Sequence, residues 1–245
     1  MVRLVDVHCH LYEFKRTDID DFKDMLILAV SDDYESSCKT LELADEYSNV
    51  IPAVGLHPWS LSEVNPKEEL KRISKLINNY DVRVLGEIGL DKKFTPETFN
   101  KQLEVFRELL ALAKDYDLKV NLHAAGAWRE VYDEVLSYDI DSVLFHWYTG
   151  PLDLLEEIVS QGFFISINPA IKIQDKHRKV LEYVKIDHIL TESDGPYNYR
   201  GLKLTPKMVE ELVKSISTLK NQPLETVKTK IFENFTRYVG VRRYG

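Results

Sequence analysis

The feature that most constrains the fold is a series of eight short apolar segments separated by stretches with helical patterning. Several of these segments are apolar nearly throughout, which is typical of parallel strands covered by helices. The expected strands span residues 4–11, 25–31, 50–57, 82–90, 119–124, 142–149, 163–169 and 188–194.

Helix-like segments lie between the expected strands. The clearest spans 95–116, where apolar residues recur at every third or fourth position. Another spans 204–219, and a last helix is expected after Pro223. Eight strands alternating with helices predict an α/β fold, a (β/α)8 TIM barrel formed by residues 1–245 as a single domain. A doubly wound open sheet is the alternative, but no Gly-x-Gly-x-x-Gly motif follows the first strand.

Composition narrows the classes of function. The formal net charge of -8 argues against a broad basic surface for nucleic acid. No apolar run is long enough to span a bilayer, and polar residues interrupt the first ten positions, where a signal peptide would be apolar. We therefore expect a cytoplasmic protein. Cys9 and Cys38 are too few for a disulfide framework or a cysteine-based zinc site, and we expect both to be reduced.

Side chains that can bind metal ions gather at the ends of the expected strands. Asp6, His8 and His10 share one face of the first strand, because side chains two residues apart point the same way. In a parallel barrel the carboxyl ends of all strands meet at one rim, where active sites of this fold are built. The residues near later strand ends are His57, Glu87, His123, His146 and Asp194.

Imidazole and carboxylate ligands together suit Zn²⁺, Mn²⁺ and related divalent ions. Four histidines and two or three carboxylates exceed one tetrahedral set of ligands, and they suffice for two ions about 3.5–4 Å apart. We therefore expect two divalent metal ions as cofactors, with Mg²⁺, Mn²⁺ and Zn²⁺ as the candidates. His177 and His188 do not end an expected strand, and we expect both to be structural.

Seven motifs give the chain a resemblance to a known family. It resembles the TatD-type metal-dependent deoxyribonucleases in "VDVHCHL", "VGLHPW", "LGEIGLD", "NLH", "FHWYTG", "TESDGP" and "ENFTRYVG", which occur in the family's order over nearly the whole chain. The resemblance implies a TIM-barrel hydrolase that cleaves phosphodiester bonds of DNA. Such enzymes typically trim single strands from one end with divalent metal ions.

The resemblance also implies roles for individual residues. His8 and His10 would bind the first ion, and Asp194 would lie close to that ion and accept a proton from the attacking water. Glu87 would bridge the two ions, so that Asp194 and Glu87 would be the catalytic residues. The second ion would be bound by His123 and His146.

The chain departs from the family pattern at three places near the expected site. The family usually has His-x-Arg on the fifth strand, whereas His123 is followed by Ala124 and Ala125, so a cation is missing there. The common His-Pro-His motif reads His-Pro-Trp at 57–59, and Asp-Tyr-Tyr reads Asp-Lys-Lys at 91–93. Substrate recognition is therefore less well defined by the resemblance than the metal chemistry.

Further residues are expected to support the ligands or to touch the substrate. Asp6 is expected to orient a ligand histidine, and His57 to lie near the substrate phosphate. Loop cations that could replace the missing arginine are Lys92, Lys93, Lys172 and Arg200. Aromatic residues that could stack on bases are Trp59, Trp147, Tyr148 and Tyr197.

Two other functions are compatible with the sequence. The leading alternative is metal-dependent hydrolysis of an ester or amide on the same barrel, for example by an aminoacyl-tRNA deacylase or a lactonase. A catalytically silent metal-binding scaffold is the third, although no expected ligand is lost. Our main expectation is a monomer that acts on single-stranded DNA, without an obligate protein partner or a membrane.

Overall fold

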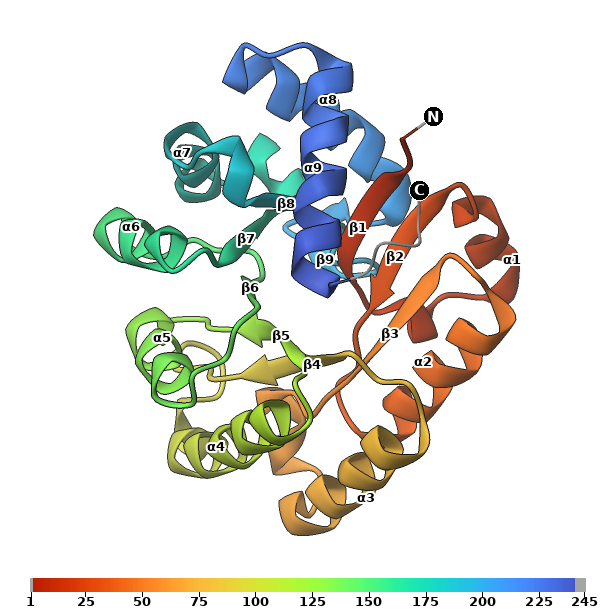
Figure 1. The fold of residues 1–245 in the computed structure, drawn as a ribbon, viewed down its shortest axis with the longest axis vertical. Coiled ribbons are helices and arrows are strands. Elements are labelled where there is room, and N and C mark those ends of the chain that lie inside the picture. Colours follow the sequence, from red (N-terminus) through yellow and green to blue (C-terminus); the bar gives the residue numbers. More distant parts are fainter. Residues whose placement is uncertain (1, 241–245) are drawn as a thin grey trace.

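Eight parallel strands form a nearly closed barrel with helices around its outside (Figure 1). The structure is a computed structural model, and it describes residues 2–240. The strands are β1 (Leu4–Cys9), β2 (Met25–Ala29), β3 (Val50–Val54), β4 (Val84–Gly89), β5 (Lys119–His123), β6 (Val143–Phe145), β7 (Phe164–Ile167) and β8 (Ile189–Thr191). Each strand pairs in parallel with the next one in the chain, from β1 to β8. The expected TIM barrel is therefore confirmed.

Helices follow the strands and cover the barrel from outside (Figure 1). They are α1 (Arg16–Ile19), α2 (Tyr34–Glu46), α3 (Pro66–Asn79), α4 (Phe99–Asp115), α5 (Trp128–Ser137), α6 (Leu152–Ser160), α7 (Asp175–Tyr183), α8 (Val209–Lys220) and α9 (Leu224–Val239). Short 3-10 helices are η1 (Leu11–Glu13), η2 (Asp20–Phe22), η3 (Pro58–Ser62), η4 (Pro96–Thr98), η5 (Pro169–Lys172), η6 (Ile186–His188) and η7 (Pro206–Met208). Within residues 2–240, no helix has the length and apolar character needed to cross a membrane.

The first and last strands are joined at the rim by hydrogen bonds from residues beyond the ladder. The backbone N–H of Asp194 donates to the carbonyl oxygen of His8 at 2.9 Å, and that of His10 donates to the carbonyl oxygen of Gly195 at 2.9 Å. Lower in the barrel, the Thr191 hydroxyl donates to the Val5 carbonyl oxygen at 2.5 Å. The "HCH" and "ESDG" segments are therefore held side by side.

The strands are shorter at their carboxyl ends than the apolar pattern indicates. His57, His146 and Asp194 lie beyond β3, β6 and β8, although the apolar pattern places each of them inside a strand. Their backbone N–H groups donate to loop or strand-end carbonyl oxygens, those of Asp32, Leu122 and His8, respectively. These three side chains are therefore carried on strand-to-helix connections, where the backbone can turn them toward the barrel axis.

Helix starts fix the geometry of these connections. At the start of α2, the Ser36 N–H donates to the Asp33 carboxylate at 2.8 Å, which satisfies a free donor of the first turn. The Ser36 hydroxyl in turn accepts the N–H groups of Asp32 and Asp33, both at 2.9 Å. Asp32 is thereby held at the rim just before the helix. The two cysteines are free, as expected.

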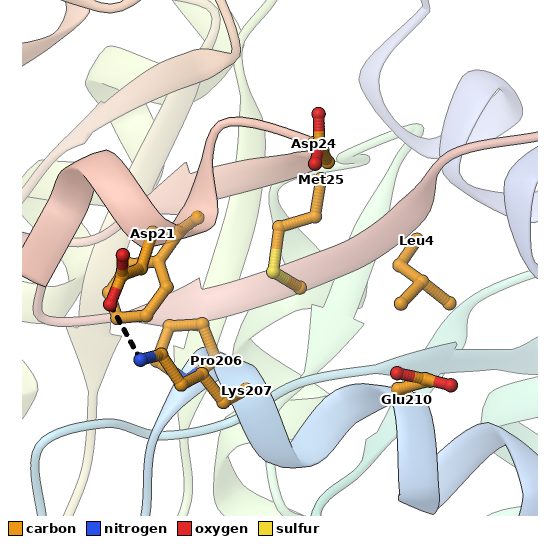
Figure 2. A pocket seen from close by; sticks show the side chains of 8 residues that line it. Leu4, Asp21, Asp24, Met25, Pro206, Lys207 and Glu210 are labelled. Carbon is orange, nitrogen blue, oxygen red and sulfur yellow. Dashed lines mark hydrogen bonds and ion pairs between the residues drawn. The ribbon is translucent and has the colours of Figure 1, made fainter.

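The opposite end of the barrel carries a pocket without metal-binding geometry (Figure 2). It lies where β1 and β2 begin, beside Leu4 and Met25, and so at the other end of the strands from the histidines. Lys207 and Asp21 pair across it at 2.6 Å. No residue that lines this pocket belongs to the histidine cluster described below.

His177 is structural, as expected. It is fully buried on α7, and its Nδ1 lies 3.1 Å from the Tyr148 carbonyl oxygen while its Nε2 lies 3.1 Å from the Asn168 N–H nitrogen. A neutral imidazole satisfies both contacts, with one nitrogen donating and the other accepting. His188 is likewise held, with Nδ1 3.0 Å from the Phe163 carbonyl oxygen.

Protonation of His177 should destabilise the fold. Burial lowers its pKa from 6.5 to about 4, so between these values the unfolded chain binds one more proton than the native protein. The contribution of the neutral His177 ring to the free energy of unfolding is fully present above pH 6.5 and is lost as the pH falls toward 4. The loss is about 2 kcal/mol at pH 5. Urea denaturation at pH 7 and at pH 5 should show this loss of unfolding free energy in wild type and a smaller loss in His177→Gln. Equal losses in the two proteins would contradict it.

Candidate metal centre

Glu87 lies at the centre of the converging side chains. It is on β4 and only 2% exposed. Its Oε1 lies 2.7 Å from Nδ1 of His123 and 3.1 Å from Nε2 of His146. Nε2 of His57 lies 3.3 Å from the same oxygen. One carboxylate oxygen therefore faces three imidazoles, which come from the ends of β3, β5 and β6.

The other oxygen of Glu87 faces the first strand. Oε2 lies 3.3 Å from Nε2 of His8 and 3.5 Å from Nε2 of His10. The same two nitrogens lie 3.5 and 3.6 Å from Oδ1 of Asp194. The Glu87 carboxylate thus separates two groups of donor atoms, each of a size that could surround a divalent ion.

Glycines on β4 allow the neighbouring strand to approach Glu87. A Cβ atom on Gly86 would lie 2.6 Å from the Cβ of Asn121, and one on Gly89 would lie 1.9 Å from the His123 carbonyl oxygen. Gly89 also has a φ of +147°, which side chains disfavour. The "GEIG" sequence therefore brings β5, and with it His123, close enough to reach Glu87.

The imidazole of His8 is oriented by Asn121. Its Nδ1 lies 2.8 Å from the Asn121 Oδ1, and the Asn121 amide is itself fixed because its Nδ2 donates to the Val7 carbonyl oxygen at 2.8 Å. His8 therefore carries its proton on Nδ1 and directs the Nε2 lone pair into the centre. This Nε2 is buried and has no hydrogen-bond partner among residues 2–240. An unpaired, buried imidazole nitrogen between two carboxylates fits a metal ligand.

His123 is oriented in the same way by Asp91. Nε2 of His123 lies 2.9 Å from the Asp91 Oδ2, so that Nδ1 points toward Glu87. Although burial opposes ionisation, the hydrogen bond from His123 is the largest of the effects that lower the pKa of Asp91 to about 2. The ionised Asp91 makes His123 a better donor toward a cation.

Two further carboxylates stand behind the remaining imidazoles. Asp32 Oδ1 lies 3.3 Å from Nδ1 of His10, and Asp32 also accepts the Tyr12 hydroxyl at 2.7 Å. Glu192 Oε2 lies 3.6 Å from Nδ1 of His146. Each of these contacts leaves the Nε2 of the histidine facing Glu87.

The charges of the centre favour bound cations. Although burial opposes ionisation, four of the surrounding imidazoles hold the pKa of Glu87 well below its usual value, so that the carboxylate is ionised. They belong to His57, His146, His8 and His123. Burial also opposes protonation of His10, but Asp32 and the other carboxylates raise its pKa well above the usual value. The field that stabilises an extra proton on an imidazole would equally stabilise a divalent ion.

Asp6 occupies a different place from the one expected. Its Oδ1 accepts the backbone N–H of Ser193 at 2.8 Å and that of His8 at 3.3 Å, and burial raises the pKa of Asp6 to about 7. The ring of His8 is oriented by Asn121 instead. Asp6 therefore holds the backbone of the segment that carries Asp194 against β1.

Four residues that touch the expected ligands were not predicted from the sequence. Asn121 is a polar residue inside an otherwise apolar strand, and this interruption is a signal that could have identified it. The three carboxylates follow strand ends closely, so the rule that found the histidines could have found them too. They are Asp32, Asp91 and Glu192.

The expected substrate-binding residues occupy different surroundings. His57 lies within the cluster itself, 3.3 Å from Glu87. Lys92 is exposed and pairs with Glu130 on α5, while Arg200 is exposed with its guanidinium 5.2 Å from the ring centre of Tyr199. The expected stacking role of Tyr148 is wrong. That ring is fully buried, and its hydroxyl donates to the Pro151 carbonyl oxygen.

Comparisons with known sequences agree with this geometry. The family described as "TatD related DNase" matches residues 5–240. An uncharacterized metal-dependent hydrolase of Methanocaldococcus jannaschii is 29% identical over 97% of each chain. The Escherichia coli uncharacterized metal-dependent hydrolase YcfH is also 29% identical, over 96% of this chain and 94% of the relative.

Solved structures share the fold. YjjV, a TatD homologue from Escherichia coli, superposes with a TM-score of 0.88 at 24% identity and covers 98% of this chain and 99% of its own. A TatD family hydrolase from Entamoeba histolytica gives a TM-score of 0.78 at 19% identity, over 96% and 97% of the two chains. With the family match over nearly all of its length and a histidine and carboxylate cluster at the rim of its barrel, the chain belongs to the TatD-related DNase family and is a metal-dependent hydrolase.

Proposed function

We propose that this protein hydrolyses phosphodiester bonds of single-stranded DNA at a centre of two divalent metal ions. The observation that supports this most is the position of Glu87, whose two carboxylate oxygens face separate groups of imidazoles. His8, His10 and Asp194 would complete the ligands of the first ion. The ligands of the second ion would be completed by His123 and His146.

The metal ions would supply an acidified water and positive charge for the phosphate oxygens, which a protein of net charge -8 otherwise lacks. The side chains of the protein would hold the reacting groups in position and would provide a base. Asp194 is held by its backbone N–H, whose nitrogen lies 2.9 Å from the His8 carbonyl oxygen, and its side chain is 9% exposed. In this proposal the Asp194 carboxylate accepts the proton of the attacking water.

His57 would stand beside the scissile phosphate. Its Nδ1 accepts the Trp59 N–H at 3.2 Å, so the proton of the neutral ring is on Nε2, the nitrogen that faces Glu87 and His123. An N–H group in that place could donate to an anionic oxygen of the bound substrate.

The substrate can be tested with end-labelled DNA. Purified protein should shorten a 5′-labelled or a 3′-labelled single strand progressively in Mg²⁺, Mn²⁺ or Zn²⁺, and EDTA should abolish cleavage. An aminoacyl-tRNA and a simple lactone serve as rival substrates, because the Ala124–Ala125 segment lacks the family's usual arginine. If metal-loaded protein hydrolyses a rival substrate and leaves DNA intact, the proposal of phosphodiester hydrolysis is wrong and ester hydrolysis takes its place.

The number of metal ions is a separate prediction. Wild-type protein loaded with Zn²⁺ or Mn²⁺ and dialysed should retain two ions per chain by elemental analysis. His123→Ala should retain about one, because its ring serves only the second ion in this scheme. His188→Gln is the matched control, since His188 lies outside the cluster, and it should retain both. One ion in wild type, or two in His123→Ala, would contradict a dinuclear centre.

Loss of the proposed base should affect turnover more than metal content. Asp194→Asn keeps the shape of the side chain but cannot accept a proton, so kcat on DNA should fall by about 100-fold or more. Metal content measured on the same sample should fall by less than half. A loss of turnover that only matches the loss of metal would assign Asp194 to metal binding alone.

A further inference from the structure

A row of aromatic rings leads from the metal centre to the surface. The ring centres of His123 and Trp59 are 6.0 Å apart, and those of Trp59 and Phe94 are 5.6 Å apart, edge to face in both cases. The Lys93 ammonium follows, 4.6 Å from the ring centre of Phe94. Trp59 is 39% exposed and Phe94 is 54% exposed, so the outer part of the row is open to a ligand.

One buried carboxylate fixes the whole row. The Trp59 indole N–H donates to Asp91 Oδ2 at 2.6 Å, and Asp91 Oδ1 accepts the backbone N–H groups of Lys93 and Phe94, both at 2.7 Å. Asp91 is itself in contact with His123. The exposed rings are therefore held in a defined position relative to the metal ligands, and a ligand would not have to order them on binding.

Lys93 is the free cation of this surface. Its neighbour Lys92 pairs with Glu130, whereas no carboxylate in residues 2–240 lies within ion-pair distance of Lys93. The Lys93 Cβ also lies 3.5 Å from the position that a Cβ on Gly126 would occupy. It therefore adjoins the Ala124–Gly126 loop, where the family's usual arginine is missing.

We propose that Trp59, Phe94 and Lys93 form a nucleotide-binding subsite beside the metal centre. A base would stack on the exposed rings, and Lys93 would pair with a phosphate next to the scissile one. The subsite rests on the proposed function, and it adds a reason for a single-stranded substrate. A base can reach these rings only when it is unpaired and turned out of a helical stack.

The stacking part can be tested with Phe94→Ala. Base–aromatic stacking implies a rise in KM of about 10-fold for a single-stranded oligonucleotide, with little change in kcat. The effect should disappear when the base at the affected position is replaced by an abasic residue. Tyr80→Ala is the matched control, because Tyr80 is also 54% exposed but lies just before β4, at the other end of the barrel. Tyr80→Ala should leave KM unchanged for both the normal and the abasic oligonucleotide.

The electrostatic part can be tested with Lys93→Gln. Removing one phosphate contact on a single strand should reduce the slope of log KM against log salt by about 0.7. Lys185→Gln is the control, since Lys185 is exposed and precedes η6 and β8 at the far end of the barrel. It should keep the wild-type slope.

Failure of the subsite and failure of the proposed function have different signatures. If wild-type protein cleaves DNA while Phe94→Ala affects normal and abasic strands equally and Lys93→Gln keeps the wild-type salt slope, the subsite is wrong and the nuclease function stands. If metal-loaded wild type leaves DNA intact and hydrolyses an ester, both proposals are overturned.

Discussion

The interaction on which the site depends is that of one buried carboxylate with the imidazoles around it. Glu87 is nearly inaccessible to water, and a lone ionised carboxylate at such a depth would be strongly unfavourable. Five imidazoles have a ring nitrogen within 3.5 Å of its oxygens. Protonated rings, or metal ions bound between the rings and the carboxylate, would supply the compensating positive charge. The barrel makes this possible, because it brings the ends of distant strands to one axis. The histidine cluster therefore depends on the fold.

Polar groups behind the histidine rings decide which ring nitrogen faces Glu87. A histidine can present either ring nitrogen to a metal, and the hydrogen bond on the opposite side decides which. Asn121 and Asp91 lie within hydrogen-bond distance of two of these rings, and the Asp32 carboxylate lies 3.3 Å from a third. Asp91 has a wider role, because the carboxylate that orients His123 also holds Trp59 and the backbone of the loop that follows β4. Metal binding and the exposed surface beside it are thus built on the same residue.

Departures from the family pattern are connected in space. The tryptophan of the His-Pro-Trp motif, the lysine pair after Asp91 and the alanines after His123 lie far apart in the chain, yet they border one stretch of the rim. The connection after β5 lacks the family's usual arginine. The neighbouring connection after β4 carries Lys93 and Phe94, and the one after β3 carries Trp59. The residues that surround Glu87 match the family motifs, so the departures lie beside the metal centre and not among its histidines.

The sequence by itself determined the barrel, because eight apolar segments alternating with helices have few other ways to bury their surface, and it determined which histidines reach the rim, because strand ends of one barrel meet there. Only the tertiary structure decided how those side chains are used. It placed His57 inside the cluster, gave the orientation of His8 to Asn121 rather than to Asp6, and buried Tyr148. It also ended the strands earlier than their apolarity indicates. These outcomes depend on contacts between residues many positions apart, such as Glu87 and His8, and local patterning carries no record of such distances.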